Sequence, residues 1–189
     1  MSMTTDATGL IAARKVARLG ADGTGRPDRI VHALDGLCEP VDAEDVGHIA
    51  LQLWRACREQ LDLTDELPDY LLGLDAGGIV PVLALAQASG IRFKIAWKLA
   101  LELPGAIRFT EPHSTRPDMH AYSIEAGAKV LIVDDEVTSG RTLASLVVAL
   151  RRAGAVPLAA ACLIEDVHQA GRNVLEDMGV PLVSLAKIP

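Results

Sequence analysis

The sequence has little of what several large protein classes require. Its 189 residues include only three cysteines, Cys38, Cys57 and Cys162, an odd number at wide spacing. Such cysteines fit buried thiols in a reducing compartment better than a disulfide framework. No apolar run approaches the roughly 18 residues that a membrane span needs, and the first residues lack the basic and apolar regions of a signal peptide. We therefore expect a cytoplasmic protein without a membrane partner.

Positive charge is also scarce. The chain has 18 Lys and Arg against 25 Asp and Glu, a formal net charge of −7. No block of basic residues forms a stripe that could neutralise the phosphates of a nucleic acid, so we expect no nucleic-acid partner. A G-x-x-x-x-G-K-[ST] phosphate loop is missing. The five histidines show no metal-ligand spacing.

The apolar pattern predicts one α/β domain. Half of the residues are hydrophobic, which is enough for one sizeable core. Short strands alternate with helices in the second part of the chain, as in a mostly parallel sheet covered on both faces. We expect two N-terminal helices at 10–19 and 42–61, strands at 70–74, 91–96, 129–133, 157–164 and 181–186, and helices at 81–89, 142–153 and 170–178.

Residues 130–142, Val-Leu-Ile-Val-Asp-Asp-Glu-Val-Thr-Ser-Gly-Arg-Thr, are the most informative segment. An apolar strand ends in two carboxylates, Asp134 and Asp135. Hydroxyls, a glycine and backbone N–H groups follow where a helix is expected to begin, which suits a phosphate. Two acids after a strand are more often a solvated strand end, but here the whole ordered string favours a site.

This string resembles the ribose-phosphate motif of type I phosphoribosyltransferases, which bind 5-phosphoribosyl-1-pyrophosphate (PRPP) and exchange its pyrophosphate for a base. The resemblance implies that Asp134 and Asp135 hold the ribose hydroxyls and serve a magnesium ion, Mg2+, whose preference is for oxygen ligands. It also implies that the loop after them wraps the 5-phosphate. The residues assigned to sugar-phosphate binding there are Glu136, Val137, Thr138, Ser139, Gly140, Arg141 and Thr142.

A second loop, at residues 73–80, also connects an apolar strand to a helix. Glycines in such turns are usually simple connections. In this place, however, the loop resembles the pyrophosphate loop of the purine phosphoribosyltransferases, with Asp75, Ala76, Gly77 and Gly78 as binding residues. Gly77 stands where adenine-type enzymes carry arginine, and the xanthine-type pattern has a small residue there.

Lys98 precedes a Leu-Pro-Gly element that the same branch shares, and the resemblance makes it a pyrophosphate ligand. Its neighbour Trp97 replaces the family's arginine, so a second cation is missing. Residues 99–122 have no sustained period and contain three prolines. A stretch of this kind is either a surface insertion or a binding loop, and the resemblance implies a mobile lid, in which Glu111 and His113 are candidates for proton transfer.

Base recognition rests on two segments. By resemblance, residues 29–41 form a hood over the base, and Leu34, Asp35 and Gly36, with Leu37, are candidates for its lining; the alternative is a plain connecting loop. Asp166 stands where xanthine-type enzymes often place lysine. Because a carboxylate accepts hydrogen bonds from an amino group, this residue favours adenine over xanthine.

These observations predict one domain at residues 1–189, with N-terminal helices and hood at 1–68 and a core at 69–189. Its fold class is α/β: a type I phosphoribosyltransferase fold, with a mostly parallel twisted sheet flanked by helices, a small N-terminal hood and a mobile lid. The resemblance implies a magnesium-dependent pentosyltransferase of purine salvage, and a homodimer. Two alternatives stay open: an enzyme using another pyrophosphorylated sugar phosphate, and a PRPP-binding regulator without catalysis.

Overall fold

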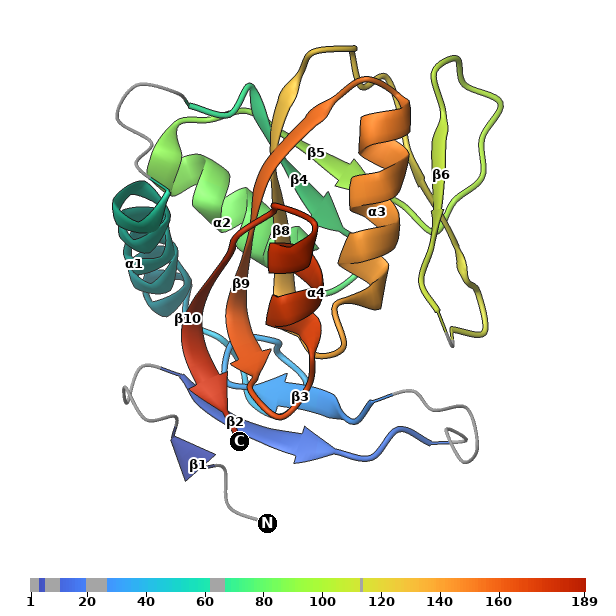
Figure 1. The fold of residues 1–189 in the computed structure, drawn as a ribbon. Coiled ribbons are helices and arrows are strands. Elements are labelled where there is room, and N and C mark those ends of the chain that lie inside the picture. The colour runs from blue at the N-terminus through green and yellow to red at the C-terminus, as the bar shows by residue number, and fades with distance from the viewer. Residues whose placement is uncertain (1–3, 6–10, 20–26, 62–66, 113) are drawn as a thin grey trace.

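The core of the computed structural model is a parallel β-sheet between two layers of helices (Figure 1). The structure describes residues 4–5, 11–19, 27–61, 67–112 and 114–189. The sheet has five strands in the order β10-β9-β8-β4-β5, all pairing in parallel. Its strands are β4 (Tyr70–Leu74), β5 (Phe93–Ala96), β8 (Lys129–Val137), β9 (Val156–Asp166) and β10 (Leu182–Ile188).

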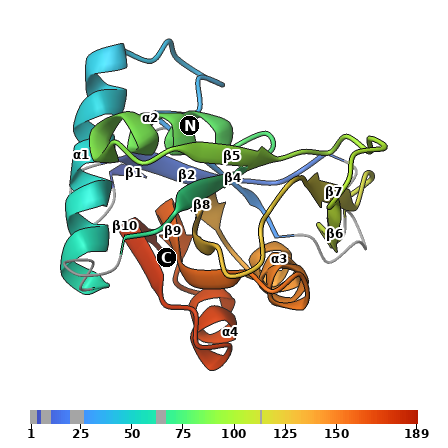
Figure 2. The same cartoon turned by 90° about the horizontal axis from the view of Figure 1, so that it is seen from above.

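Helices cover both faces of this sheet (Figure 2). On one face lie α1 (Ala43–Gln60) and α2 (Ile79–Ser89), and on the other lie α3 (Arg141–Arg152) and α4 (Gly171–Asp177). Helix α3 turns one apolar stripe, made of Leu143, Leu146, Val147 and Leu150, into the core. The α/β class and the flanked parallel sheet that the sequence predicted are thus confirmed.

Two regions differ from the predicted elements. The segment expected to be a helix at 10–19 contains strand β2 (Ala12–Val16), which pairs with β1 (Thr4–Thr5) and β3 (Arg29–His32) in an antiparallel sheet. Figure 1 places this small sheet at the C-terminal ends of β9 and β10. We call this sheet, together with the described residues 17–19 and 27–41 that flank its strands, the hood. The helical prediction was wrong because the apolar pattern of this segment is short, and its backbone forms hydrogen bonds with β3, which lies later in the chain, instead of within a helix.

The predicted lid contains regular structure. Within residues 99–122, strands β6 (Ile107–Thr110) and β7 (Asp118–Ala121) form an antiparallel hairpin. Phe109 and Met119 of this hairpin are buried in the same apolar cluster as α3, and the hydroxyl of Ser145 on α3 accepts a hydrogen bond from the N–H of Thr110 at 2.9 Å. The hairpin therefore has a packed base beside α3.

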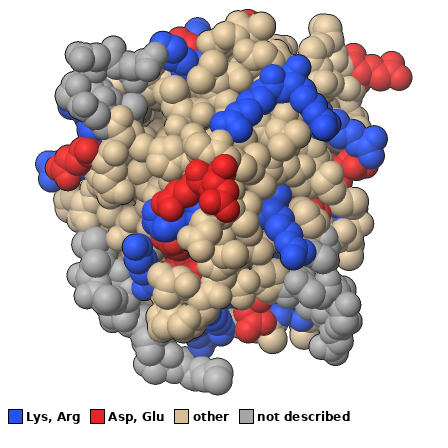
Figure 3. Space-filling view, viewed as in Figure 1, with Lys and Arg blue, Asp and Glu red and all other residues tan. Residues whose placement is uncertain are grey.

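Two further features concern the charge of the surface and the apolar character of the helices. On the described part of the face in Figure 3, Lys and Arg form short groups separated by acidic and uncharged surface. Among the described helices, none combines the length and the apolar character that crossing a bilayer demands.

Candidate active site

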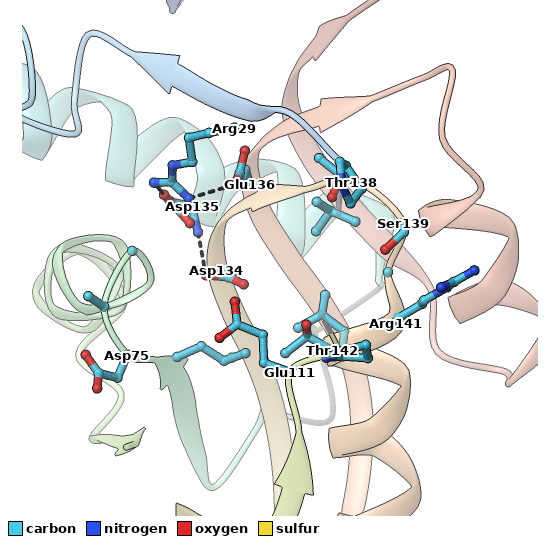
Figure 4. Close-up of a pocket in the computed structure, with 18 of the residues that line it drawn as sticks. Arg29, Asp75, Glu111, Asp134, Asp135, Glu136, Thr138, Ser139, Arg141 and Thr142 are labelled. Atoms are coloured by element: carbon cyan, nitrogen blue, oxygen red, sulfur yellow. Dashed lines mark hydrogen bonds and ion pairs between the residues drawn. The ribbon is translucent and has the colours of Figure 1, made fainter. Parts of the chain in front are cut away.

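A cavity of about 370 Å³ lies between the hood, the hairpin and the N-terminus of α3 (Figure 4). It opens at the C-terminal ends of the parallel strands, where α/β sheets commonly bind ligands. Its lining comes from separate parts of the chain: Arg18, Pro27, Arg29 and Leu37 from the hood, Leu74, Asp75, Ala76 and Gly77 after β4, Lys98, then Glu111, Pro112 and Met119 of the hairpin segment, and residues 134–143.

The turn from β8 into α3 forms one wall of this cavity. Gly140 adopts a left-handed conformation with φ of +69°, and a Cβ there would lie 2.8 Å from the backbone of Gly171. Only glycine therefore lets the turn pack this closely. The first N–H groups of α3 have no acceptor within the helix, and the hydroxyls of Thr138, Ser139 and Thr142 line the cavity beside them. This wall is suited to an anion such as a phosphate.

The two acids of β8 lie side by side but have different electrostatic surroundings. Burial, together with the charge of Asp135, raises the pKa of Asp134 well above its ordinary value. For Asp135, burial opposes ionisation, yet hydrogen bonding to His32 and the charge of Arg29 lower its pKa below the ordinary value. The Asp135 carboxylate is therefore ionised, while Asp134 takes up a proton more readily.

The loop after β4 forms the wall opposite α3. Asp75, Ala76 and Gly77 line the cavity, and the Asp75 carboxylate accepts a hydrogen bond from the N–H of Lys98 at 3.2 Å. A Cβ at Gly77 would collide with the carboxylate of Asp135. The small residue at position 77 is thus a steric requirement of this site, because the loop passes directly over the acid.

Lys98 extends toward the hairpin. Its Nζ lies 2.7 Å from Oε2 of Glu111, and both side chains line the cavity. This ion pair links the segment after β5 to the hairpin across the opening. Gly78, predicted to bind pyrophosphate, is not among the described lining residues. A Cβ there would lie 2.7 Å from the backbone of Leu74 and 2.8 Å from that of Val133, so close packing requires glycine at this position and the binding role stays a prediction.

Glu136 holds the hood onto β8. Its Oε1 accepts from Arg29 at 2.7 Å and from Arg18 at 3.0 Å. Its Oε2 accepts the N–H of Ile30 at 2.6 Å. Glu136 lines the cavity while its described hydrogen bonds go to the hood, so its assignment to sugar-phosphate binding stays a prediction.

The two hood arginines were missed as site residues. Arg29 also pairs with Asp135, so one guanidinium bridges two consecutive acids of β8 (Figure 4). Their partners are more than 100 residues away in the sequence, so no local pattern indicated the pairing. The only signal was the presence of Arg29 at the start of the predicted hood.

Three of the predicted base-pocket residues lie elsewhere. Leu34 packs against the core beside α1 and α2. Asp35 closes a turn, since its carboxylate accepts from the N–H groups of His32 at 2.9 Å and Leu37 at 2.8 Å. Gly36 occupies that turn with φ of +68°. Of the candidates in this stretch, Leu37 lines the cavity.

Asp166, the other residue predicted to contact the base, pairs with the hood instead. Its Oδ2 lies 2.8 Å from Nζ of Lys15 in the hood, and its Oδ1 accepts the N–H of His168 at 3.0 Å. It is 4% exposed and is not among the described residues that line the cavity. The argument for adenine from this carboxylate therefore loses its geometric basis. The other candidate, His113, lies outside the described residues.

Comparison with known proteins gives consistent matches. Residues 44–180 match the family model described as phosphoribosyl transferase domain. A xanthine phosphoribosyltransferase from Chloroflexus aurantiacus is 33% identical over 177 residues, covering 90% of this chain and 81% of that protein. Adenine phosphoribosyltransferase 4 from Arabidopsis thaliana is 34% identical over 119 residues, covering 61% of this chain and 64% of its own length.

A solved structure shares the fold over nearly the whole chain. The adenine phosphoribosyltransferase of Saccharomyces cerevisiae, complexed with adenine and an imino-altritol bisphosphate, matches with a TM-score of 0.70. The match covers 92% of this chain and 93% of that one at 20% sequence identity. At this identity the likeness supports the architecture alone.

Proposed function

Because this chain belongs to the phosphoribosyl transferase domain family, in its type I purine branch, we propose that its cavity binds PRPP and a purine base and replaces pyrophosphate with the base. A nitrogen of the base attacks the anomeric carbon, the bond from that carbon to pyrophosphate breaks, and pyrophosphate leaves with the bonding electrons. The proton of the attacking nitrogen is then lost. The observation that carries this proposal is that β8 and α3 bring a pair of acids and an anion-binding turn into one cavity.

Each wall has a role in this reaction. The turn at residues 138–142 would hold the 5-phosphate, and Asp134 with Asp135 would hold the ribose hydroxyls and stabilise positive charge that develops on the sugar. The loop at residues 75–77 and Lys98 would bind pyrophosphate. Catalysis of this kind depends mainly on positioning and fixed charges, so no protein nucleophile is required.

Magnesium fits this site as an ion shared with the substrate. No group of three or more His, Cys, Asp or Glu among the described residues is arranged to hold a metal by itself, and the Asp135 carboxylate is engaged by Arg29. Asp134 and Asp75 face the cavity, and Mg2+ typically takes one or two carboxylates with phosphate oxygens and waters. When bound, it would neutralise charge on pyrophosphate.

We also propose that the hairpin β6–β7 and its flanks act as the lid, with Glu111 as the group that exchanges a proton with the base or the leaving group. The support is that Glu111 lies in the cavity wall and contacts Lys98. Hydrogen exchange of the amides at the hairpin tip should slow severalfold when PRPP and Mg2+ bind. Equal exchange rates with and without PRPP would contradict a lid.

The homodimer and the cytoplasmic location stay predictions. Val80 and Leu83, large apolar side chains on the outer side of α2, are exposed and offer a surface for a second copy. Light scattering at several protein concentrations measures the state directly, and a monomer at every concentration would contradict the dimer.

The reaction is tested by incubating the protein with PRPP, Mg2+ and each of adenine, hypoxanthine, guanine and xanthine, followed by mass analysis of the products. We expect a nucleoside monophosphate and pyrophosphate in equal amounts. PRPP binding by calorimetry without product from any base would instead favour a PRPP-binding regulator. Absence of both binding and product would favour a different sugar phosphate.

A further inference from the structure

The hood end of the cavity presents guanidinium groups. The side chains of Arg29 and Arg18 are 24% and 26% exposed, whereas their partners Asp135 and Glu136 are 4% and 9% exposed. All four side chains line the cavity, and the arginines are the more exposed of them. A molecule that enters this end can therefore contact guanidinium N–H donors.

The carboxylates behind them already have donors. Both oxygens of Glu136 accept hydrogen bonds, from Arg18 and Arg29 on one side and from the N–H of Ile30 on the other. The Asp135 carboxylate accepts from Arg29 and lies 3.7 Å from Nε2 of His32. Arg29 donates two hydrogen bonds to these acids, and a guanidinium carries further N–H groups. The Arg29 guanidinium therefore has N–H groups beyond the two that these acids accept.

The position of Arg29 relative to the sugar site makes it relevant to the base. Asp134 and Asp135 occupy the middle of the cavity, with the α3 turn and the loop after β4 on either side. A base bonded to a ribose held by these acids has the hood as its remaining wall. Since Arg29 contacts Asp135 itself and lines the cavity, its guanidinium would be within reach of a base attached to that ribose.

A wall of donors discriminates between purines by the group on carbon 6. Hypoxanthine has a carbonyl oxygen there, which accepts hydrogen bonds, whereas adenine has an amino group, which donates them. A donor opposite a donor leaves both groups unpaired after desolvation, and a site built on hydrogen bonds rejects such a ligand.

Resting on the proposed function, we propose that Glu136 is a positioning residue that fixes Arg29, with Arg18, at the hood end, and that this wall selects 6-oxopurines over adenine. Two buried carboxylates hold the Arg29 fork in one orientation, so little freedom is lost when a carbonyl binds. Asp166, which faces away from the cavity into its pair with Lys15, has no direct part in this choice.

The test is competition between equimolar hypoxanthine and adenine, with PRPP and Mg2+, read by the masses of the two products. For the wild type we expect the hypoxanthine product to exceed the adenine product about tenfold or more. In Glu136→Gln the ratio should fall about tenfold and the KM for hypoxanthine should rise, while the KM for PRPP stays within about twofold. Arg29→Lys keeps a charge but loses the fork, and should lower the ratio as well.

Asp166→Asn is the matched control, because it loosens the hood at its other ion pair without altering a cavity wall. Its product ratio should equal that of the wild type, whatever its Tm. A wild-type preference for adenine overturns the inference and leaves the proposed function standing. So does an unchanged ratio in both Glu136→Gln and Arg29→Lys, or an equal shift in Asp166→Asn. No product from any base contradicts the proposed function, and the inference with it.

Discussion

Strands β8 and β9 lie side by side in parallel, and each carries consecutive acids near its C-terminal end. Glu136 pairs in register with Ile164, so the acids of β9, Glu165 and Asp166, lie just beyond those of β8. The acids of both strands are largely buried, and basic residues contact Asp135 and Glu136 of β8 as they contact both acids of β9. Residue type and strand position alone do not distinguish them.

Their surroundings do distinguish them. Glu165 is bound by Arg172 of α4 at 2.8 Å and by the hydroxyl of Ser184 at 2.7 Å, and Asp166 is bound by Lys15. The acids of β8 instead border a cavity, because the glycine turn leads from them into α3. An acidic strand end can meet a ligand where a ligand-sized space adjoins it, as at β8, whereas side chains of the protein occupy the space beside Glu165 and Asp166.

The largest expected effect on activity among the acids of the two strands is that of Asp134→Asn. The variant replaces a carboxyl oxygen at the proposed sugar site with an amide NH2, which cannot accept a hydrogen bond from a ribose hydroxyl, and this should lower kcat/KM by about 10²–10³-fold. Because the pKa of Asp134 is raised in the fold, the wild type should lose stability as pH rises through that folded pKa, and the variant should not. Steady-state kinetics and thermal unfolding across pH measure both effects. Retention of full activity would contradict the assignment of β8 to the sugar.

Glu165→Gln on β9 should lower the stability of the protein and leave its activity nearly unchanged. Breaking a buried, Arg-paired carboxylate should cost about 2–4 kcal/mol of unfolding free energy, with kcat/KM within about twofold of the wild type. The pKa of Glu165 is lowered in the fold, against burial, by its bonds to Arg172 and Ser184. Wild-type stability should therefore fall as pH drops below the ordinary value of 4.5, and fall less in the variant. Urea unfolding at several pH values measures this; a large loss of activity at unchanged stability would place Glu165 in the site.

A smaller effect is expected at Lys98. Replacing it with Met would remove the proposed charged contact to pyrophosphate and should raise the KM for PRPP about ten- to a hundredfold, with a smaller change in the KM for the base. Lys94 offers a matched control, since its Nζ binds the carbonyl of Ser123 at 2.7 Å and it is not among the described lining residues. Equal changes in Lys98→Met and Lys94→Met would contradict a specific pyrophosphate contact.

The smallest effect is expected at Asp166. Asp166→Asn should leave the ratio of adenine to xanthine products within about twofold of the wild type, because this carboxylate faces Lys15. A modest fall in Tm should accompany the loss of the ion pair. Competition between the two bases measures the ratio, and a large shift would restore Asp166 to the base site.

The local parts of the site could be predicted from the sequence. Strand β8, its acids and the turn into α3 are contiguous, so one stretch of 13 residues holds both the carboxylates and the anion-binding backbone. The loop after β4 is contiguous in the same way. Strand and helix periodicity predicted the core elements, because each buries one pattern of side chains against the sheet.

The remaining parts depend on contacts between distant segments. Strand β2 became a strand only through its pairing with β3, and Arg18 and Arg29 entered the site only because Glu136 and Asp135, more than 100 residues away, hold them. The sequence by itself determined the acids, the turns and the order of elements, since these follow from neighbouring residues. Only the tertiary structure decided which acids border the cavity and which basic residues pair with them, as Arg29 does with Asp135 and Glu136, because burial and charge pairing are set by side chains that approach through space.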